Sequence, residues 1–274
     1  MKSNINYLHT SGLSGHRPTK ILLIGAGGNG SLMLSRLYKM HVALTALGQP
    51  GFDVSLCDPD TVSSANMGRQ PFFQSDIGAN KAETLIWRLC GSAGDLSWTA
   101  IPRRAECEDL RNADMVITCV DTISSRRQIH QWLESSHYTT TKYWLDMGNE
   151  ADTGQVVLGQ IEHRYGNRRG KLPTVAELVP AITDPATKET DTPSCSVAEA
   201  LEKQDLFINE QIVMQAATLL WELFSKRMVR YSIVYINVRD FAINAVPIQL
   251  EAWKRLGIHY PRGLATSHSI VEMS

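Results

Sequence analysis

The sequence has no excess of charge, few cysteines and no long apolar run. It carries 27 Lys and Arg residues against 28 Asp and Glu, a formal net charge of −1, so its composition does not indicate a nucleic-acid binder. Five cysteines without a C-x-x-C pair argue against a disulfide framework and against a four-thiolate zinc site. The eight histidines show no H-x-x-x-H spacing. Because no stretch resembles a signal core or a membrane span, we expect a soluble cytoplasmic protein.

The chain is long and apolar enough to bury a sizeable core. Its 274 residues, 43% of them hydrophobic, suffice for one large α/β domain with additions or for two small domains. No internal repeat and no low-complexity run divides it.

The most informative stretch is 21–30, four aliphatic residues followed by Gly-Ala-Gly-Gly-Asn-Gly. It predicts a buried parallel strand and a tight turn into a helix whose apolar positions recur at helical spacing from Met33 to Leu47. The turn contains Gly25, Gly27, Gly28 and Gly30. Glycine lets the backbone turn sharply and admits a phosphate, which the helix N-terminus would favour. We therefore predict a nucleotide site here, although Gly-x-Gly-x-x-Gly alone is a weak signal.

An acidic residue ends the second predicted strand, 53–57. In nucleotide-binding βαβ units such an acid commonly accepts hydrogen bonds from ribose, about 20 residues after the glycines. Here Asp58 follows Gly30 by 28 residues, so we expect an extended helix or exit loop between them.

Two cations follow soon after this acid. Arg69 precedes Gln70, and Lys81 opens a predicted helix over 78–92. Arginine grips phosphate through two parallel hydrogen bonds and lysine supplies a compact charge, so both fit a polyphosphate over the glycine turn. The alternative is a pair of solvated surface cations.

A second acid ends another predicted strand, 115–120, before a helix over 124–136. Asp121 would thus lie at the carboxyl edge of a parallel sheet, where ligands bind, and carboxylate oxygen suits Mg²⁺. A helix N-cap explains the residue equally well.

The segment 162–194 is polar, with four prolines and a cluster of basic residues, and predicts a mobile crossing with one short helix at Thr174-x-x-Glu177. Cys195 follows it. We expect Ser196 and Glu199 to cap a long helix to about Phe224, which would place the Cys195 thiol near a helix N-terminus, where thiolate is favoured. Cys195 is either a nucleophile or a structural residue. The other four cysteines lie in or beside apolar segments and are expected to be inert.

The remaining elements complete a mostly parallel, Rossmann-like α/β sheet. Further strands are expected over 96–101, 143–147 and 155–161, with an added antiparallel C-terminal pair, 231–238 and 241–246. Residues 1–19, with glycines and a proline, are expected to be a loose lead-in.

Four motifs in chain order then resemble the ThiF/MoeB/HesA family of ubiquitin-activating-enzyme-like proteins. They are Gly25-x-Gly27-Gly28-x-Gly30, Asp58-x-Asp60-x-Val62-x-x-x-Asn66-x-x-Arg69-Gln70, Gly78-x-x-Lys81-Ala82 and Val120-Asp121-x-x-x-x-Arg126. Within the family the chain is most similar to the ThiF-type member of PRTRC systems, plasmid clusters that also encode a ubiquitin-like protein. The resemblance implies a single domain over 1–274: a nucleotide-binding core, 20–160, a crossover loop, 162–194, and a C-terminal part, 195–274.

The resemblance also implies an adenylation site for ATP and Mg²⁺. Asp58 would hold the ribose, Asp121 the metal, and Arg126 would support Asp121. The phosphates would be held by the glycine turn together with Asn66, Arg69, Gln70 and Lys81.

The implied partner is a small ubiquitin-like β-grasp protein that ends in glycine, and the implied assembly is a homodimer. The family's zinc-binding cysteine pairs are absent, so no zinc is expected. The arginine that many members insert into a partner's site has no clear counterpart, and Arg17 is a poor candidate. The expected reaction is adenylation of the partner's terminal carboxylate, which needs positioning and positive charge rather than a general base. If Cys195 is a nucleophile, transfer of the activated carboxyl group to its thiol is expected as a second step.

Three rival functions remain open from the sequence. A nicotinamide-dependent dehydrogenase would explain the glycine turn but not the late acid or the Arg69 and Lys81 pair. A non-catalytic scaffold could retain the nucleotide pocket. Adenylation of a small carboxylate or of an RNA base is also possible, although the neutral net charge disfavours RNA.

Overall fold

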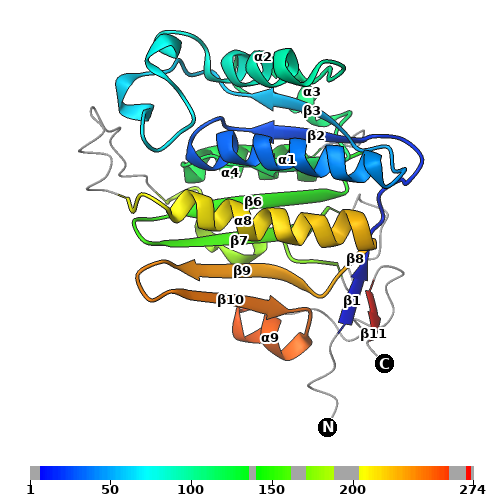
Figure 1. Ribbon diagram of the computed structural model, residues 1–274. Coiled ribbons are helices and arrows are strands. Elements are labelled where there is room, and N and C mark those ends of the chain that lie inside the picture. Colours follow the sequence, from blue (N-terminus) through cyan, green and yellow to red (C-terminus); the bar gives the residue numbers. More distant parts are fainter. Residues whose placement is uncertain (1–6, 136–139, 162–170, 188–203, 259–269, 273–274) are drawn as a thin grey trace.

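A computed structural model describes residues 7–135, 140–161, 171–187, 204–258 and 270–272. Their centre is an eight-stranded sheet in the order β10-β9-β7-β6-β5-β2-β3-β4 (Figure 1). Five neighbouring strands run parallel: β4 (Thr99–Ile101), β3 (Phe52–Cys57), β2 (Thr19–Ile24), β5 (Met115–Thr118) and β6 (Tyr143–Asn149). The antiparallel strands are β7 (Thr153–Gln160), β9 (Tyr231–Asn237) and β10 (Ala242–Pro247). The predicted mostly parallel sheet with an antiparallel C-terminal pair is confirmed.

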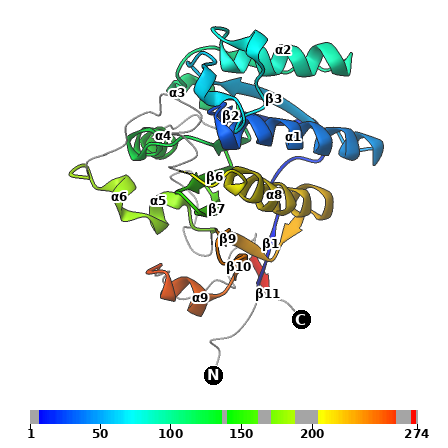
Figure 2. The ribbon, with the colours of Figure 1, turned by 60° about the vertical axis from the view of Figure 1, so that its left-hand side comes forward.

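Helices cover both faces of this sheet (Figure 2). One face is covered by α1 (Gly28–Ala46), α2 (Lys81–Ala93) and α8 (Ile208–Trp221), the other by α3 (Cys107–Leu110), α4 (Ile123–Ser135), α5 (Val175–Leu178) and α6 (Pro180–Thr183). Side chains of a strand alternate between the faces. Accordingly Ile21 and Leu23 of β2 join the core under α1, whereas Leu22 and Ile24 join the core under α4.

The sheet has a switch point at β2. One neighbour of β2 in the sheet is β3, the next strand in the sequence, whereas its other neighbour is β5. In open α/β sheets ligands bind at the carboxyl ends of the strands where the order reverses. The turn after β2 and the segment after β5 therefore meet where a ligand site is expected.

The structure differs from the sequence expectations at both ends of the chain. The expected lead-in contains a strand, β1 (Tyr7–Thr10), which pairs antiparallel with β11 (Ile270–Glu272) and with β8 (Met228–Val229) in a second sheet. The expected helix from 196 is also wrong in its described part, because residues 204–207 are not helical and α8 begins at Ile208. The proposed cap by Ser196 and Glu199 lies outside the described residues.

Two local expectations at the edges of the domain have clear outcomes. The short helix at Thr174 is confirmed as α5, where the Glu177 carboxylate accepts the Thr174 backbone N–H at 2.8 Å. The expected strand 96–101 is limited to β4. A further helix, α9 (Leu250–Arg255), follows β10, and α8 continues as one π-helical turn, Glu222–Lys226. Within the described residues no helix is both long and apolar enough to cross a membrane.

Candidate active site

The glycine turn joins β2 to α1 and is packed against the segment after β5. Gly25 has a φ of +96°, and a Cβ there would lie 2.7 Å from the Cys119 carbonyl oxygen. A Cβ on Gly30 would lie 1.8 Å from the Gly25 carbonyl oxygen. Both positions therefore exclude a side chain. A Cβ on Gly27 would meet nothing within 4 Å, which leaves this part of the turn open to a ligand.

The first turn of α1 lies at the glycine turn and adds a second feature that suits an anion. The first N–H groups of a helix have no partner within the helix, and they favour an anion. Asn29 lies in this turn; its Nδ2 donates to the Asn149 side-chain oxygen at 3.0 Å. The Asn29 Oδ1 is buried and has no hydrogen-bond partner among the described residues. Gly28 packs against α8, since a Cβ there would lie 2.5 Å from the Asn209 Nδ2.

Asp58 is fixed directly against the glycine turn. Its carboxylate is 5% exposed and accepts the Ala26 backbone N–H at 2.5 Å and the Asp60 N–H at 2.8 Å. Burial raises the pKa of Asp58, while these two amide bonds and the charge of Lys81 act in the opposite direction. The structure thus brings this acid to the turn as expected, and its role toward a ribose stays a prediction.

Lys81 is buried, with 7% of its surface exposed, so it is not a solvated surface cation. It is the first residue of α2, and its Nζ lies 3.1 Å from the Asp60 carboxylate. Asn80 holds this helix end in place: its Oδ1 accepts the Glu83 N–H at 3.0 Å, and its Nδ2 donates to the Asp58 carbonyl at 3.0 Å. The Lys81 ammonium is thus connected to the glycine turn in steps: Lys81 pairs with the Asp60 carboxylate, and the Asp60 N–H donates to Asp58. The Asp58 carboxylate in turn accepts the Ala26 N–H.

Arg69 and its neighbours lie in the loop between β3 and α2. The half-buried Arg69 donates from Nη1 to the Gln204 side-chain oxygen, while its Nε is buried without a partner among the described residues. Burial lowers the pKa of this guanidinium. The Gln70 Oε1 is likewise buried and unpartnered within the described part. Asn66 uses its side-chain oxygen to accept the Ser63 N–H at 2.8 Å, which leaves its amide nitrogen for a ligand.

Asp121 follows β5 and is exposed. The N-cap explanation for it fails, because Thr122 caps α4 by accepting the Ser125 N–H at 3.2 Å. Its segment adjoins the glycine turn, since the Cys119 N–H donates to the Ile24 carbonyl at 2.9 Å. An exposed carboxylate at the carboxyl edge of the sheet fits a magnesium ligand. That Arg69, Lys81 and Asp121 converge on one triphosphate stays a prediction.

The expected support of Asp121 by Arg126 is wrong. The Arg126 guanidinium pairs with Asp146 of β6, its Nε lying 3.0 and 3.2 Å from the two carboxylate oxygens. Its Nη2 donates to the Met147 carbonyl at 3.3 Å. Asp146 is fully buried, so it needs a cation, and Arg126 supplies it. In the sequence, Asp146 stands within an otherwise apolar predicted strand, and this is the signal that could have indicated a buried ion pair.

Two other candidate residues have no place in the described site. Cys195 lies outside the described residues. Arg17 forms a bidentate ion pair with Asp114 at 2.6 and 2.7 Å, at the opposite edge of the sheet, so it is used within its own chain. As expected for inert thiols, burial raises the pKa of Cys57 to about 12 and raises that of Cys119.

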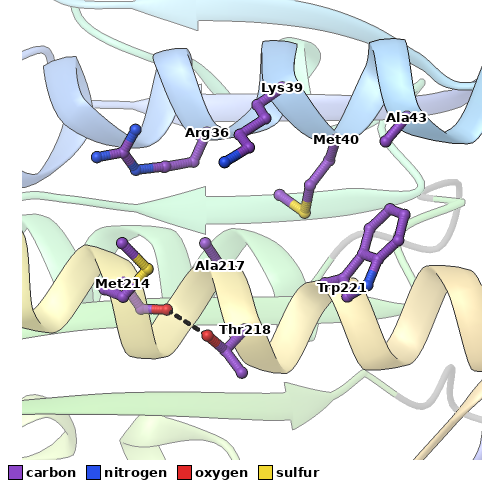
Figure 3. A pocket seen from close by; sticks show the side chains of 8 residues that line it. All are labelled: Arg36, Lys39, Met40, Ala43, Met214, Ala217, Thr218 and Trp221. Carbon is purple, nitrogen blue, oxygen red and sulfur yellow. Dashed lines mark hydrogen bonds between the residues drawn. The ribbon is translucent and has the colours of Figure 1, made fainter.

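A separate cavity of about 500 Å³ lies between α1 and α8 (Figure 3). Its walls are mainly apolar, with two basic side chains from α1. The residues that line it are Arg36, Lys39, Met40, Ala43, Met214, Ala217, Thr218 and Trp221. They come from the middle and the second half of α1 and of α8, not from the glycine turn, and we assign no role to this cavity.

Comparisons with known proteins agree with this fold. The chain is 29% identical over 189 residues to the NEDD8-activating enzyme E1 catalytic subunit of Caenorhabditis elegans, across 66% of this chain and 40% of that protein. Its fold is similar to the crystal structure of SeMet PaaA, with a TM-score of 0.55 and 12% identity over 84% of this chain and 64% of the other. It is also similar to E. coli MccB with ATP, with a TM-score of 0.52 and 16% identity over 84% and 64% of the two chains.

The chain thus spans about 40% of the length of its curated relative and less than two thirds of these structures. A match to the ThiF family covers residues 2–249. The glycine turn, Asp58, Lys81 and Asp121 all lie within that range. The chain belongs to the ThiF family.

Proposed function

We propose that this protein is an ATP-dependent adenylyltransferase that activates the C-terminal carboxylate of a small ubiquitin-like protein. The observation that carries the proposal is the contact between the Asp58 carboxylate and the Ala26 N–H, which connects buried Lys81, through its ion pair with exposed Asp60, to the glycine turn. Family membership supports it, as does the likeness to an activating enzyme of a ubiquitin-like protein and to MccB solved with ATP.

Each residue of the site has a task in this reaction. Asp58 binds the ribose, and the open amides of the glycine turn bind phosphate oxygens. Arg69 and Lys81 bind the phosphates, together with the side chains of Asn66 and Gln70. The partner's carboxylate oxygen attacks the α-phosphorus, an acyl–phosphate bond forms, and the bond to pyrophosphate breaks.

The main physical difficulty of this reaction is charge. An anion attacks an anion, and more negative charge develops on the leaving pyrophosphate. A carboxylate is already ionised at neutral pH, so the site needs preorganised cations and positioning rather than a base. Buried Lys81 and half-buried Arg69 supply such cations. Asp121 would hold Mg²⁺, which neutralises phosphate charge when bound.

The finer parts of the proposal concern partner and setting. We propose a glycine-terminated β-grasp protein as the substrate, a PRTRC-type cluster as the genetic setting, and a cytoplasmic homodimer as the working assembly. Arg17 is engaged by Asp114, so any arginine that completes the site across a dimer must be another residue.

ATP–pyrophosphate exchange in the presence of a glycine-terminated β-grasp protein tests the reaction. Lys81→Met and Asp121→Asn are each expected to reduce exchange by about 100-fold or more, the usual effect of removing one charge-stabilising group. Lys254→Met and Asp95→Asn are matched controls, because both residues are exposed and distant from the site, and they should retain exchange. Exchange that survives both site variants contradicts the proposal; tight ATP binding without exchange indicates a scaffold.

We also propose that Cys195 accepts the activated carboxyl group as a thioester. Its sulfur would attack the acyl carbonyl, AMP would leave, and the thiol proton would pass to solvent. Cys195→Ala should then keep pyrophosphate exchange and lose a protein–protein adduct that thiol reagents cleave. An adduct that persists in this variant excludes Cys195 as the acceptor.

A further inference from the structure

Among the described residues, one hydrogen bond holds the Arg69 guanidinium. Its Nη1 donates to the Gln204 side-chain oxygen. Its Nε is buried and has no partner among the described residues. Burial of a cation without a full set of acceptors is costly. The edge formed by Nε and Nη2 is one of the two edges through which arginine binds an oxyanion with two parallel hydrogen bonds.

Gln204 directly precedes a residue that is held by two hydrogen bonds at the start of α8. The next residue, Asp205, donates its N–H to the Ala151 carbonyl at 2.7 Å, in the connection between β6 and β7. The Asp205 side chain accepts the Phe207 N–H at 2.8 Å, just before α8 begins. In the first turn of α8, Asn209 packs against Gly28. Gln204 therefore adjoins the helix end that packs against the glycine turn.

We propose that Gln204 is a positioning residue for the nucleotide phosphates. By accepting from Nη1, it fixes the guanidinium plane and leaves the Nε–Nη2 edge of Arg69 for bidentate binding of a phosphate. The inference rests on the proposed function, because it assumes that ATP occupies the glycine turn. It extends that function to a residue outside the four sequence motifs, 135 positions from Arg69.

A thermodynamic cycle on nucleotide binding tests this role. Mg·ATP and adenosine are titrated calorimetrically into the wild-type protein, Gln204→Met, Arg69→Ala and the double variant. Methionine keeps the length of glutamine but removes the acceptor. Gln204→Met should weaken ATP binding by about 10-fold when Arg69 is present, as expected for a hydrogen bond to a charged group. In the Arg69→Ala background it should have an effect of less than about 2-fold.

Adenosine separates positioning from a general structural role. It has no phosphate, so Gln204→Met should leave its affinity unchanged, whereas a distorted site would bind both ligands more weakly. Gln211→Met, on the exposed side of α8, is the matched control and should bind both ligands like the wild type. Equal loss of ATP affinity with and without Arg69, or equal loss for adenosine, overturns the inference while ATP binding itself still supports the proposed function. A wild-type protein that binds no ATP overturns both.

Discussion

The buried pair Arg126–Asp146 provides a sharp test of the energetics beneath the site. Asp146 is fully buried, and its carboxylate also accepts the Thr118 hydroxyl at 2.6 Å. The Trp144 indole N–H in turn donates to the Thr118 oxygen at 2.8 Å. Asp146→Leu would leave the Arg126 cation inside the protein without a counter-charge.

The expected loss in the free energy of unfolding is large for Asp146→Leu alone and small for a variant that replaces both partners. Removal of one partner of a buried ion pair costs about 3–5 kcal/mol, whereas replacement of both by apolar residues is often neutral or stabilising. Asp146→Leu should therefore lower Tm by about 6–20 °C, at about 2–4 °C per kcal/mol in a chain of this size. Combining it with Arg126→Met should restore most of this loss.

Urea denaturation followed by far-ultraviolet circular dichroism measures the free energies of unfolding. Asp152→Leu is the matched control, because Asp152 pairs with Arg239 at 2.8 Å but the Arg239 side chain is 78% exposed; it should cost less than about 1 kcal/mol. The reasoning is refuted if the double variant is as unstable as Asp146→Leu alone, or if Asp146→Leu costs no more than the surface control.

Two further predictions concern pH and the glycine turn. His9 is fully buried and its Nε2 lies 2.6 Å from the Tyr143 hydroxyl; burial lowers its pKa to about 4. The unfolded chain therefore binds the proton more readily, and the free energy of unfolding falls as pH falls from about 6.5 toward 4. Between pH 7.5 and pH 5 the wild type should lose about 2 kcal/mol more of this free energy than His9→Gln, as measured in urea titrations. Parallel titration curves for the two proteins would rule out this assignment. Gly30→Ala should abolish ATP binding in calorimetry, because its Cβ would overlap the Gly25 carbonyl oxygen; wild-type affinity in this variant would show that the turn can adapt.

The central sheet and the helices beside it were predictable from the sequence because their signals are local. The runs 21–24 and 115–120 predict two strands, of which β2 contains the first and β5 covers 115–118 of the second, and the glycine run marks the turn into α1. The same signals placed Asp58 and Asp121 at strand ends, where the structure has them. Chain order alone thus indicated that acidic residues follow β3 and β5 at the carboxyl edge of the sheet.

The remaining features depend on contacts between distant segments. No local pattern joins Arg69 to Gln204, and the pairing of Arg126 with Asp146 depends on how α4 lies over β6. The sequence favours one continuous helix from Ser196, whereas residues 204–207 are not helical and the Asp205 side chain accepts the Phe207 N–H just before α8 begins. Such choices are decided by tertiary packing, which a single sequence does not reveal.

The small sheet of β1, β8 and β11 has a consequence for synthesis of the protein. Tyr7 pairs with Glu272, so β1 leaves the ribosome early but cannot find this neighbour until almost the entire chain has been translated. The parallel strands of the large sheet, by contrast, are complete once Asn149 has emerged. Loop closure over so great a separation is slow, and we expect the half that contains the parallel strands to fold during translation and the terminal strands to join last.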